Sequence, residues 1–468
     1  MRIERDSLGP RRIPANAYYG AQTDRAIDNF QISGLKSHPV FIDTYVIIKK
    51  AAALANAELG ILVPSKKKAI VKACDEILAG KLGNPFVVDV YQMGAGTSIH
   101  MNVNEVIANR ANEILGGRKG QYNKVHPNDH VNMGQSTNDT FPTAMRLAAA
   151  QLIQDVLDEP LKSLENSLVR KGREFDRVLK SARTHLQDAV PIRLGQEFKA
   201  YGETIRRCHQ DITYARGALL EIGLGGSAVG TGMNTQKGYP TKVTRILSRL
   251  LGLKIKVSKD LCEAMQSQRA ISLVSASLRN LALEVNRISN DLRLLSSGPT
   301  TGFSEIVLPP SAPGSSIMPG KVNPSIPEMV NMVCYQVMGC DTTIAAAVQA
   351  GQLELNVMMP VMSFNLNFSI QIFGNALRTL NDKCVKGIKA NKKRCLEYAE
   401  RSMGLAAALN PYIGYSKAAE VAKEALRLRK TLIQVIREKN ILSEAQIAKI
   451  MNPITMTQPG NSRKYRDS

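Results

Sequence analysis

The sequence predicts a mainly α-helical protein of three domains, in which the long helices of the middle domain pack into a bundle. Three stretches repeat apolar residues at spacings of three and four, the pattern of a helix with one buried face. Apolar residues make up 44% of the 468 residues, but aromatic residues only 5%, and tryptophan is absent. This composition favours aliphatic helix packing over an aromatic-rich β-sandwich. A chain of this length is longer than a single hydrophobic core usually supports, so several domains are expected.

The N-terminal domain is predicted to span residues 1–140 and to be mixed but mostly helical. Helical patterns cover residues 42–59 and 65–79. Glycine-rich turns are expected near Gly94 and Gly116.

The middle domain is predicted to span residues 141–395 and to carry the three long apolar stripes. The stripes run over residues 161–179, 198–222 and 271–295. A helix of about 30 residues is about 45 Å long, so such helices must pack side by side. Three leucines lie off the last stripe: Leu273, Leu283 and Leu294. These leucines predict a second helical neighbour, and long helices of this kind commonly pack against helices of other subunits.

The C-terminal domain is predicted to span residues 396–468. Shorter helices are expected around Leu405, Ala419 and Ile433, and a basic tail follows them. The tail includes residues 463–466.

The chain carries a net charge of +21, and its sequence pI is about 9.7. The basic residues form short, separate runs, and no nucleic-acid-binding module is recognisable. This distribution favours a solvated surface, or a field that attracts small anions, over nucleic acid as a partner.

No apolar run reaches the eighteen or so residues that span a bilayer, and residues 1–6 lack the apolar core of a signal peptide. The seven cysteines are scattered and never form a C-x-x-C pair, which predicts reduced thiols rather than disulfides or a zinc site. We therefore expect a cytoplasmic protein without a membrane partner.

The segment GSSIMPGKVNP, residues 314–324, places two hydroxyls beside a lysine and an asparagine. It is too rich in glycine and proline to form a helix or strand, and it suits a lid that closes over a ligand. An ordinary surface loop is the alternative. A phosphate loop does not fit, because five residues separate Gly314 from Gly320 and Val322 follows Lys321 where a hydroxyl is required.

Three further polar clusters are expected at helix edges: residues 94–98, 135–139 and 183–188. Taken singly, each is most simply a helix N-cap. Together with the lid they supply hydroxyls, amides, an imidazole and an ammonium that can converge on a small dianion, aided by helix dipoles.

At this point the chain resembles the aspartase/fumarase superfamily of anti-elimination lyases over nearly its whole length. The resemblance rests on these motifs: GSSIMPGKVNP, QSTNDTFPTA, THLQDAVP, LGQEF, SAVGTG and NDLRLLSSGP. GAGTS, QSTND and NPSIPE resemble the aspartases, whereas HPNDHVN and LGGSAVGTG also suit fumarases. The resemblance implies a three-domain lyase fold, a homotetramer with one central helical core, and active sites assembled from three subunits.

The aspartase resemblance implies reversible loss of ammonia from L-aspartate to give fumarate through an aci-carboxylate (enediolate) intermediate. It names Ser315 as the general base, with Lys321 and His185 completing the catalytic group. We expect that no cofactor or metal is required. The resemblance also implies roles for the remaining residues. The β-carboxylate is contacted by Thr97, Ser136, Thr137 and Ser316. The α-carboxylate is contacted by Thr184, Asn323 and Lys321, and the ammonium by Asn138 and His185.

A serine is far too weak an acid to ionise unaided. Backbone N–H groups of the lid, Lys321, or a closure that excludes water could activate Ser315. The chain also departs from the family pattern, with His100 where asparagine is usual, Thr300 where arginine is usual and Met359 where glutamate is usual. None of these removes a proposed catalytic group, and each could shift substrate preference.

Two alternatives remain beside the aspartase reading. One is fumarase, which hydrates fumarate to malate through the same kind of enediolate. The other is a non-catalytic lyase scaffold retained for binding, for example of nucleic acid.

Overall fold

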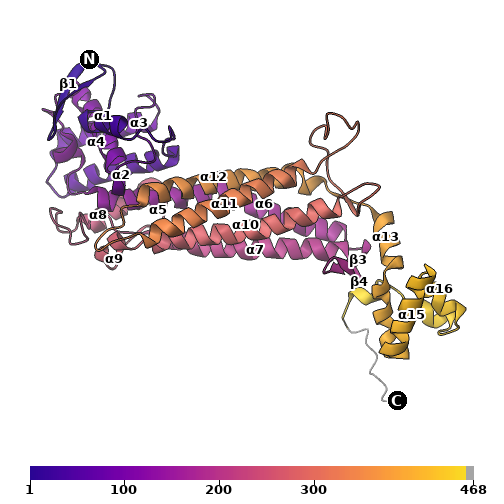
Figure 1. Ribbon diagram of the computed structural model, residues 1–468. Coiled ribbons are helices and arrows are strands. Elements are labelled where there is room, and N and C mark those ends of the chain that lie inside the picture. The colour runs from indigo at the N-terminus through magenta and orange to yellow at the C-terminus, as the bar shows by residue number, and fades with distance from the viewer. Residues whose placement is uncertain (460–468) are drawn as a thin grey trace. The chain divides into compact units, whose positions relative to one another are not determined.

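The computed structural model describes residues 1–459, and this part of the chain is mainly helical, as predicted (Figure 1). Its strands form four short two-stranded pairings. Three pairings are antiparallel: β1 (Arg2–Asp6) with β2 (Gly9–Ile13), β3 (Leu179–Thr184) with β4 (Gln187–Arg193), and β7 (Ile306–Val307) with β8 (Lys389–Ala390). The fourth is parallel, between β5 (Glu221–Ile222) and β6 (Lys256–Val257).

The chain divides into two compact units. Unit one comprises Met1–Glu159, Cys208–Ala282 and Cys334–Asn375; unit two comprises Pro160–Arg207, Leu283–Val333 and the chain from Ala376 onward. Four long helices are each shared between the units: α7 (Leu194–Leu219), α10 (Arg269–Leu295), α11 (Ser325–Gln349) and α12 (Met359–Lys383). Because the units are built from interleaved segments, the domain boundaries near 140 and 395 stay predictions.

The first helices of unit one follow the sequence patterns closely. The helices that lie wholly in unit one are α1 (Ala21–Asn29), α2 (Pro39–Glu58), α3 (Pro64–Leu78), α4 (Thr97–Ile114), α5 (Thr137–Leu152), α8 (Tyr239–Leu251) and α9 (Leu261–Gln266). Helices α2 and α3 confirm the helical patterns at 42–59 and 65–79. Both begin with proline at the first helical position, where the missing N–H leaves no bond unmade.

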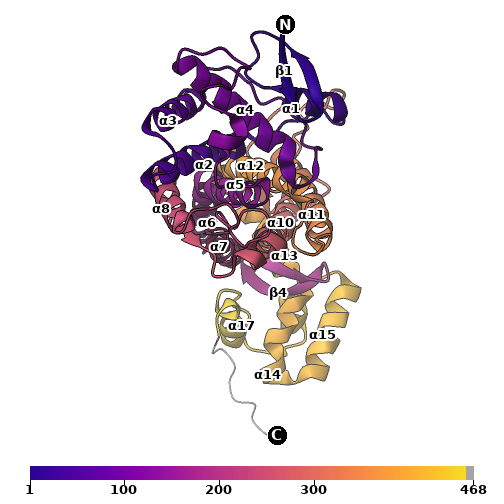
Figure 2. The same ribbon diagram turned by 90° about the vertical axis from the view of Figure 1, so that its left-hand side faces the viewer.

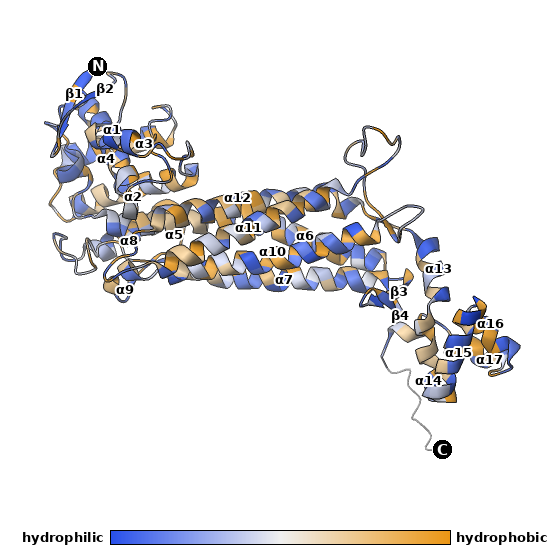
Figure 3. Ribbon diagram, in the orientation of Figure 1, coloured by the Kyte–Doolittle hydropathy of each residue, from blue (hydrophilic) through white to orange (hydrophobic). Residues whose placement is uncertain are grey.

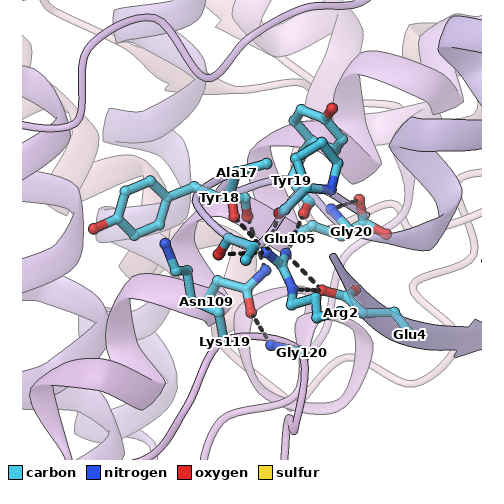
Figure 4. A network of polar contacts seen from close by, with 12 residues as sticks. Arg2, Glu4, Ala17, Tyr18, Tyr19, Gly20, Glu105, Asn109, Lys119 and Gly120 are labelled. Carbon is cyan, nitrogen blue, oxygen red and sulfur yellow. Dashed lines mark hydrogen bonds and ion pairs between the residues drawn. The ribbon is translucent and has the colours of Figure 1, made fainter. Parts of the chain in front are cut away.

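A buried carboxylate anchors the start of α1 to α4 (Figure 4). Glu105 of α4 accepts hydrogen bonds from the N–H groups of Gly20 (2.8 Å), Gln22 (2.9 Å) and Thr23 (3.2 Å), and from the Thr23 hydroxyl (2.6 Å). It therefore caps, from another helix, the N–H groups at the beginning of α1 that have no partner within the helix. Burial raises the pKa of Glu105 to about 7, although these hydrogen bonds favour the charged form.

Beside Glu105, the Arg2 guanidinium fastens the N-terminal segment (Figure 4). It donates to the carbonyls of Pro14, Ala17 and Tyr19, and pairs with Glu4 at 2.7 Å. The first twenty residues are thus held by side-chain bonds as well as by the β1–β2 pairing.

The predicted long helices are present. They are α6 (Asp158–Glu174), α7 (Leu194–Leu219), α10 (Arg269–Leu295), α11 (Ser325–Gln349) and α12 (Met359–Lys383). Both stripes predicted for 198–222 and 271–295 are buried along their whole length. The helical stretch predicted for 161–179 is wrong at its end: α6 stops at Glu174, and Leu179 begins β3 because it pairs with Arg193 of β4.

Within each unit, segments of the long helices lie side by side (Figures 1 and 2). In unit one, Ser275 of α10 donates to Asp341 of α11 at 2.5 Å. In unit two, Tyr201 of α7 donates to Asp291 of α10 at 3.0 Å. Hydrophobic residues recur along these helices (Figure 3), and the off-stripe Leu283 and Leu294 are 47% and 39% exposed.

The C-terminal part of unit two has a hydrophobic core of its own. Its helices are α13 (Lys392–Arg401), α14 (Asn410–Ile413), α15 (Tyr415–Leu428), α16 (Leu432–Glu438) and α17 (Glu444–Ile450). Helices α15 and α16 confirm the patterns around Ala419 and Ile433, whereas Leu405 lies in a 3-10 helix, Met403–Leu409. Residues 463–466 of the predicted basic tail lie outside the described residues.

None of the helices in residues 1–459 combines the length and the apolarity that crossing a bilayer requires.

We predict that Glu105→Gln lowers the free energy of unfolding by about 2 kcal/mol at pH 8, where the carboxylate is charged. The new amide group places a donor against backbone N–H donors. Differential scanning calorimetry measures the change. Glu113→Gln on the same helix is the control, because its carboxylate makes a partly exposed ion pair with Arg110, which contributes about 1 kcal/mol or less. Equal losses in both variants would contradict the capping role of Glu105.

Candidate active site

The lid segment lies in unit two between β7 and α11, and residues 308–324 contain neither helix nor strand, as predicted. The loop closes on itself: Gly314 N–H donates to the carbonyl of Lys321 at 2.8 Å, and the Asn323 amide donates to the carbonyl of Gly314 at 2.6 Å. A Cβ at Gly314 would lie 2.2 Å from the Lys321 carbonyl oxygen. Only glycine fits at this position, so Asn323 and Gly314 both serve the shape of the loop.

Ser315 lies at the turn of this loop. Its Oγ accepts hydrogen bonds from the backbone N–H groups of Ile317 (3.2 Å) and Met318 (2.9 Å). Two N–H dipoles aimed at one oxygen favour negative charge on that oxygen. The sequence suggests three ways to activate Ser315. These two hydrogen bonds correspond to one of them, in which backbone N–H groups of the lid stabilise the ionised hydroxyl. Ser316 and Lys321 are exposed beside it.

A cavity of about 700 Å³ in unit two adjoins the end of the lid. Lys321 and Asn323 line it, together with Arg293 near the end of α10 and the Ser296–Pro299 turn. The cavity therefore brings two predicted α-carboxylate ligands together with a further cation, Arg293. Sequence reasoning did not single out Arg293, which looks like one of many basic residues on a helix.

The cluster 183–188 corrects a prediction, because it forms the β3–β4 hairpin turn and not a helix edge. Thr184 pairs with Gln187 across the turn. His185 and Leu186 between them have φ angles of 57° and 58°, the left-handed conformation that a two-residue hairpin turn of this type requires. Thr184 and His185 are both exposed, so His185 is not the satisfied core or capping histidine that a lone histidine most often is.

In unit one, the cluster 135–139 begins helix α5. Ser136 is the N-cap: its hydroxyl accepts from the N–H of Asn138 at 3.2 Å, while the Asp139 carboxylate accepts from the N–H of Ser136 at 2.9 Å. This reciprocal pair is a capping box. The capping interpretation is therefore correct for Ser136, and its hydroxyl hydrogen can still be donated to a ligand. Thr137, the first residue of α5, is partly exposed next to it.

Asp139 also joins a distant loop to this turn. Its second carboxylate oxygen accepts from the N–H groups of Gly225 and Ser227, each at 3.0 Å. The Asn138 amide donates to the Ala228 carbonyl at 2.9 Å. Burial raises the pKa of Asp139 to about 6, against the effect of its three N–H donors. The Ser-x-x-Asp spacing indicates a helix cap and could have identified Asp139 from the sequence. The spacing does not predict the hydrogen bonds between Asp139 and the segment that contains SAVGTG.

The cluster 94–98 begins helix α4. A short 3-10 turn, Gly94–Gly96, precedes Thr97, and Ala95 N–H donates to the Val357 carbonyl at 2.7 Å. Gly96 has a φ of 85°, and a Cβ there would lie 2.1 Å from the Phe141 ring. Glycine is thus needed for both conformation and space, and it places Thr97 at the positive end of an 18-residue helix.

The ten predicted site residues consequently fall into two sets. Unit one carries Thr97, Ser136, Thr137 and Asn138; unit two carries Thr184, His185, Ser315, Ser316, Lys321 and Asn323. Among residues 1–459, no three His, Cys, Asp or Glu side chains lie together as metal ligands would.

Comparison with known proteins agrees with the motifs. Residues 9–339 match the family described as Lyase, and residues 405–458 match the family described as fumarase C C-terminus. The chain is 48% identical over 460 residues to an aspartate ammonia-lyase of a Bacillus species, covering 98% of each chain. It is 46% identical over 469 residues to that of Helicobacter pylori strain J99, covering both chains completely.

Solved structures agree as well. A cobalt-bound fumarate lyase:delta crystallin from Brucella melitensis has a TM-score of 0.94 and 47% identity, covering 98% of this chain and 100% of that one. A class II fumarase from Schistosoma mansoni has a TM-score of 0.95 and 38% identity with the same coverage. The chain therefore belongs to the aspartase/fumarase superfamily of lyases, and it resembles the aspartate ammonia-lyases over nearly its whole length.

Proposed function

We propose that this enzyme is an aspartate ammonia-lyase, which reversibly eliminates ammonia from L-aspartate to give fumarate. The observation that carries the proposal is the 48% identity, over 98% of both chains, to a protein of that name. Several other relatives with the same name are 45–47% identical. The lid and the three polar clusters provide the groups that such an elimination needs.

In the proposed reaction Ser315, as an alkoxide, takes a proton from Cβ of L-aspartate. The electron pair left on Cβ delocalises into the β-carboxylate and forms the enediolate. When the Cα–N bond breaks, its electrons leave with the nitrogen, the enediolate pair forms the C=C bond, and fumarate results. The N–H groups of Ile317 and Met318 support the role of Ser315, because they offset the charge on its oxygen.

The proposed β-carboxylate ligands match the demand for donors where the second negative charge develops. One such donor typically contributes about 2.7 to 4 kcal/mol. Ser136 and Thr97 are placed at the N-terminal ends of α5 and α4, where helix dipoles favour an anion. Thr137 and Ser316 are proposed to complete this set.

The α-carboxylate is proposed to bind Lys321 and Asn323, which line the cavity of about 700 Å³, together with Thr184. The leaving ammonium is proposed to contact His185 and the side-chain carbonyl of Asn138. The NH2 group of Asn138 already donates to the Ala228 carbonyl. This bond orients the side-chain oxygen of Asn138 as an acceptor for the ammonium. An ammonium donates three hydrogen bonds and so requires acceptors.

We propose further that the protein is a homotetramer whose active sites combine residues from three subunits. The exposed leucines on α10 and the 64% exposed Met332 on α11 support an apolar interface in unit two. We propose that the reaction needs no cofactor or metal, since hydroxyls, amides, an imidazole and an ammonium perform each step. A cytoplasmic location is proposed from the sequence, because scattered cysteines without a C-x-x-C pair predict reduced thiols.

Fumarase is the second candidate. The match of residues 405–458 to the fumarase C C-terminus, and the 38% identity to a class II fumarase, favour it. Both reactions share the enediolate and differ in the group that leaves Cα.

We predict that the purified protein releases ammonia from L-aspartate with a kcat/KM at least about a hundredfold above that for L-malate. This ratio corresponds to about 2.7 kcal/mol of transition-state binding. The ultraviolet absorbance of fumarate reports both reactions. A preference for malate would establish fumarase instead, and no turnover of either substrate would favour the non-catalytic scaffold.

Replacing Ser315 by alanine should lower kcat for L-aspartate by about a thousandfold or more, because the base is lost. The fold outside the lid should be unchanged, since the Ser315 hydroxyl accepts its hydrogen bonds from N–H groups of the same loop. Ser311→Ala is the matched control: Ser311 is an exposed serine of the same loop, and its loss should leave kcat within about twofold. Near-normal activity of Ser315→Ala would refute the assignment of the base.

For assembly, light scattering should give a mass of about four chains, and Leu283→Lys should reduce it by placing a charge in the apolar interface. Leu426→Lys on α15 is the control, because Leu426 is 63% exposed on a short peripheral helix of unit two. A wild-type monomer with full activity would rule out shared active sites.

A further inference from the structure

A layer of buried polar side chains lies next to the Ser136–Asn138 turn in unit one and performs no step of the proposed reaction. Its members come from α2, α4, α5 and the turn before α5: Tyr45, Lys49, His100, Asn132, Gln135 and Thr140. All except Asn132 are 9% exposed or less. Burying polar groups costs free energy unless each is hydrogen-bonded, so this layer needs a physical reason.

Lys49 forms one side of the layer. Its ammonium donates to Asn132 Oδ1 and Gln135 Oε1, each at 3.0 Å. Among residues 1–459 it makes no ion pair. Burial lowers the pKa of Lys49 to about 7, although the nearby Asp139 carboxylate favours the charged form.

The two amides that Lys49 holds determine the path of the chain into Ser136. The Asn132 amide donates to the Gln135 carbonyl at 3.2 Å. The Gln135 amide donates to the carbonyls of Val131 (3.0 Å) and Met133 (3.2 Å). Since Gln135 immediately precedes Ser136, the ammonium of Lys49 fixes the turn that leads into the proposed β-carboxylate ligands.

His100 and Thr140 form the other side. His100 Nδ1 lies 2.8 Å from the Tyr45 hydroxyl and 3.0 Å from Thr140 Oγ1. The Thr140 hydroxyl donates to the Ser136 carbonyl at 2.7 Å. Burial, and after it the Lys49 charge, lower the pKa of His100 well below its usual range, so the ring is neutral. This side therefore fixes Ser136 from within α5.

We propose that Lys49 and Thr140 are positioning residues of the reaction, which hold the Ser136–Asn138 turn through Gln135 and through the Ser136 carbonyl so that its donors are preorganised for the substrate. This inference rests on the proposed function, because it takes the turn to bind the β-carboxylate. Fixed donors need no reorganisation when charge develops on the substrate, and a displacement of 1 Å can reduce rates about a hundredfold.

The test compares two matched pairs of variants. Lys49→Met is paired with Lys50→Met, because Lys50 is the next residue on α2 and pairs with the exposed Asp75. Thr140→Val is paired with Thr143→Val. The Thr143 hydroxyl also donates to a carbonyl one turn back, that of Asp139 at 2.7 Å, but it makes no bond to the layer. Thr140→Val keeps the side-chain volume and opens no cavity, so it serves as the second variant if Lys49→Met does not fold.

The first readout is steady-state kinetics with L-aspartate. Lys49→Met and Thr140→Val are each expected to lower kcat at least tenfold, with KM within about fivefold of wild type. Both controls should keep kcat within about twofold. The thermal midpoint of each variant should stay within about 5 °C of wild type, which separates positioning from loss of stability.

The second readout is hydrogen–deuterium exchange of the peptide covering residues 132–139, which does not depend on turnover. Exchange should become at least about fivefold faster in Lys49→Met and Thr140→Val and stay unchanged in both controls. If wild type fails to turn over L-aspartate, the proposed function fails while exchange still tests the positioning. Unchanged exchange, or equal kcat losses in variants and controls, would overturn the inference.

Discussion

The buried carboxylate of Asp139 accepts backbone hydrogen bonds from Ser136, Gly225 and Ser227, and the candidate substrate-binding turn depends on these bonds. An ionised carboxylate without partners would not be tolerated in the interior. Three N–H donors offset that cost, and with a pKa of about 6 the group is charged at neutral pH. Its charge caps α5 and fastens a loop that lies almost ninety residues away in sequence.

The same physical device recurs through the molecule. Backbone N–H groups that a helix end or a tight loop leaves unpaired are directed at an oxygen: at Glu105 for the start of α1, at Asp139 for the start of α5, and at Ser315 in the lid. In the first two cases the oxygen belongs to a structural carboxylate. In the lid it belongs to Ser315, the proposed general base. A lyase that stabilises an enediolate needs such fixed donors in place of a mobile solvent.

The proposed positioning role accounts for the buried polar groups beside the candidate site. Lys49 and His100 would be replaced by apolar residues if packing alone were at stake, since a buried ammonium is costly. Lys49 instead donates to Gln135, the residue before Ser136, and His100 lies 3.0 Å from the hydroxyl of Thr140, four residues after it. Burying these polar groups lowers the stability of the fold but holds the turn at Ser136 in one conformation, as is common at functional sites.

The sequence by itself determined the helical class, the buried stripes of α7 and α10, the irregular lid, and the helix starts at two of the three polar clusters, 94–98 and 135–139. These features are local: a repeat of three and four residues defines a buried face in any helical context, and glycine and proline exclude regular structure wherever they gather. The family resemblance and the proposed chemistry also came from short contiguous motifs. Residue roles at the site stay predictions.

Only the tertiary structure decided the features that depend on long-range pairing. The stripe after Leu168 continues by periodicity, yet the chain leaves the helix at Glu174 because Leu179 pairs with Arg193 across a hairpin. For the same reason His185 lies at a hairpin tip rather than at a helix edge. Asp139 bonds to Gly225, and Lys49 to Gln135, across 86 residues in each case. No local pattern encodes such pairs, because the free energy that selects them comes from burying polar groups together in one folded core.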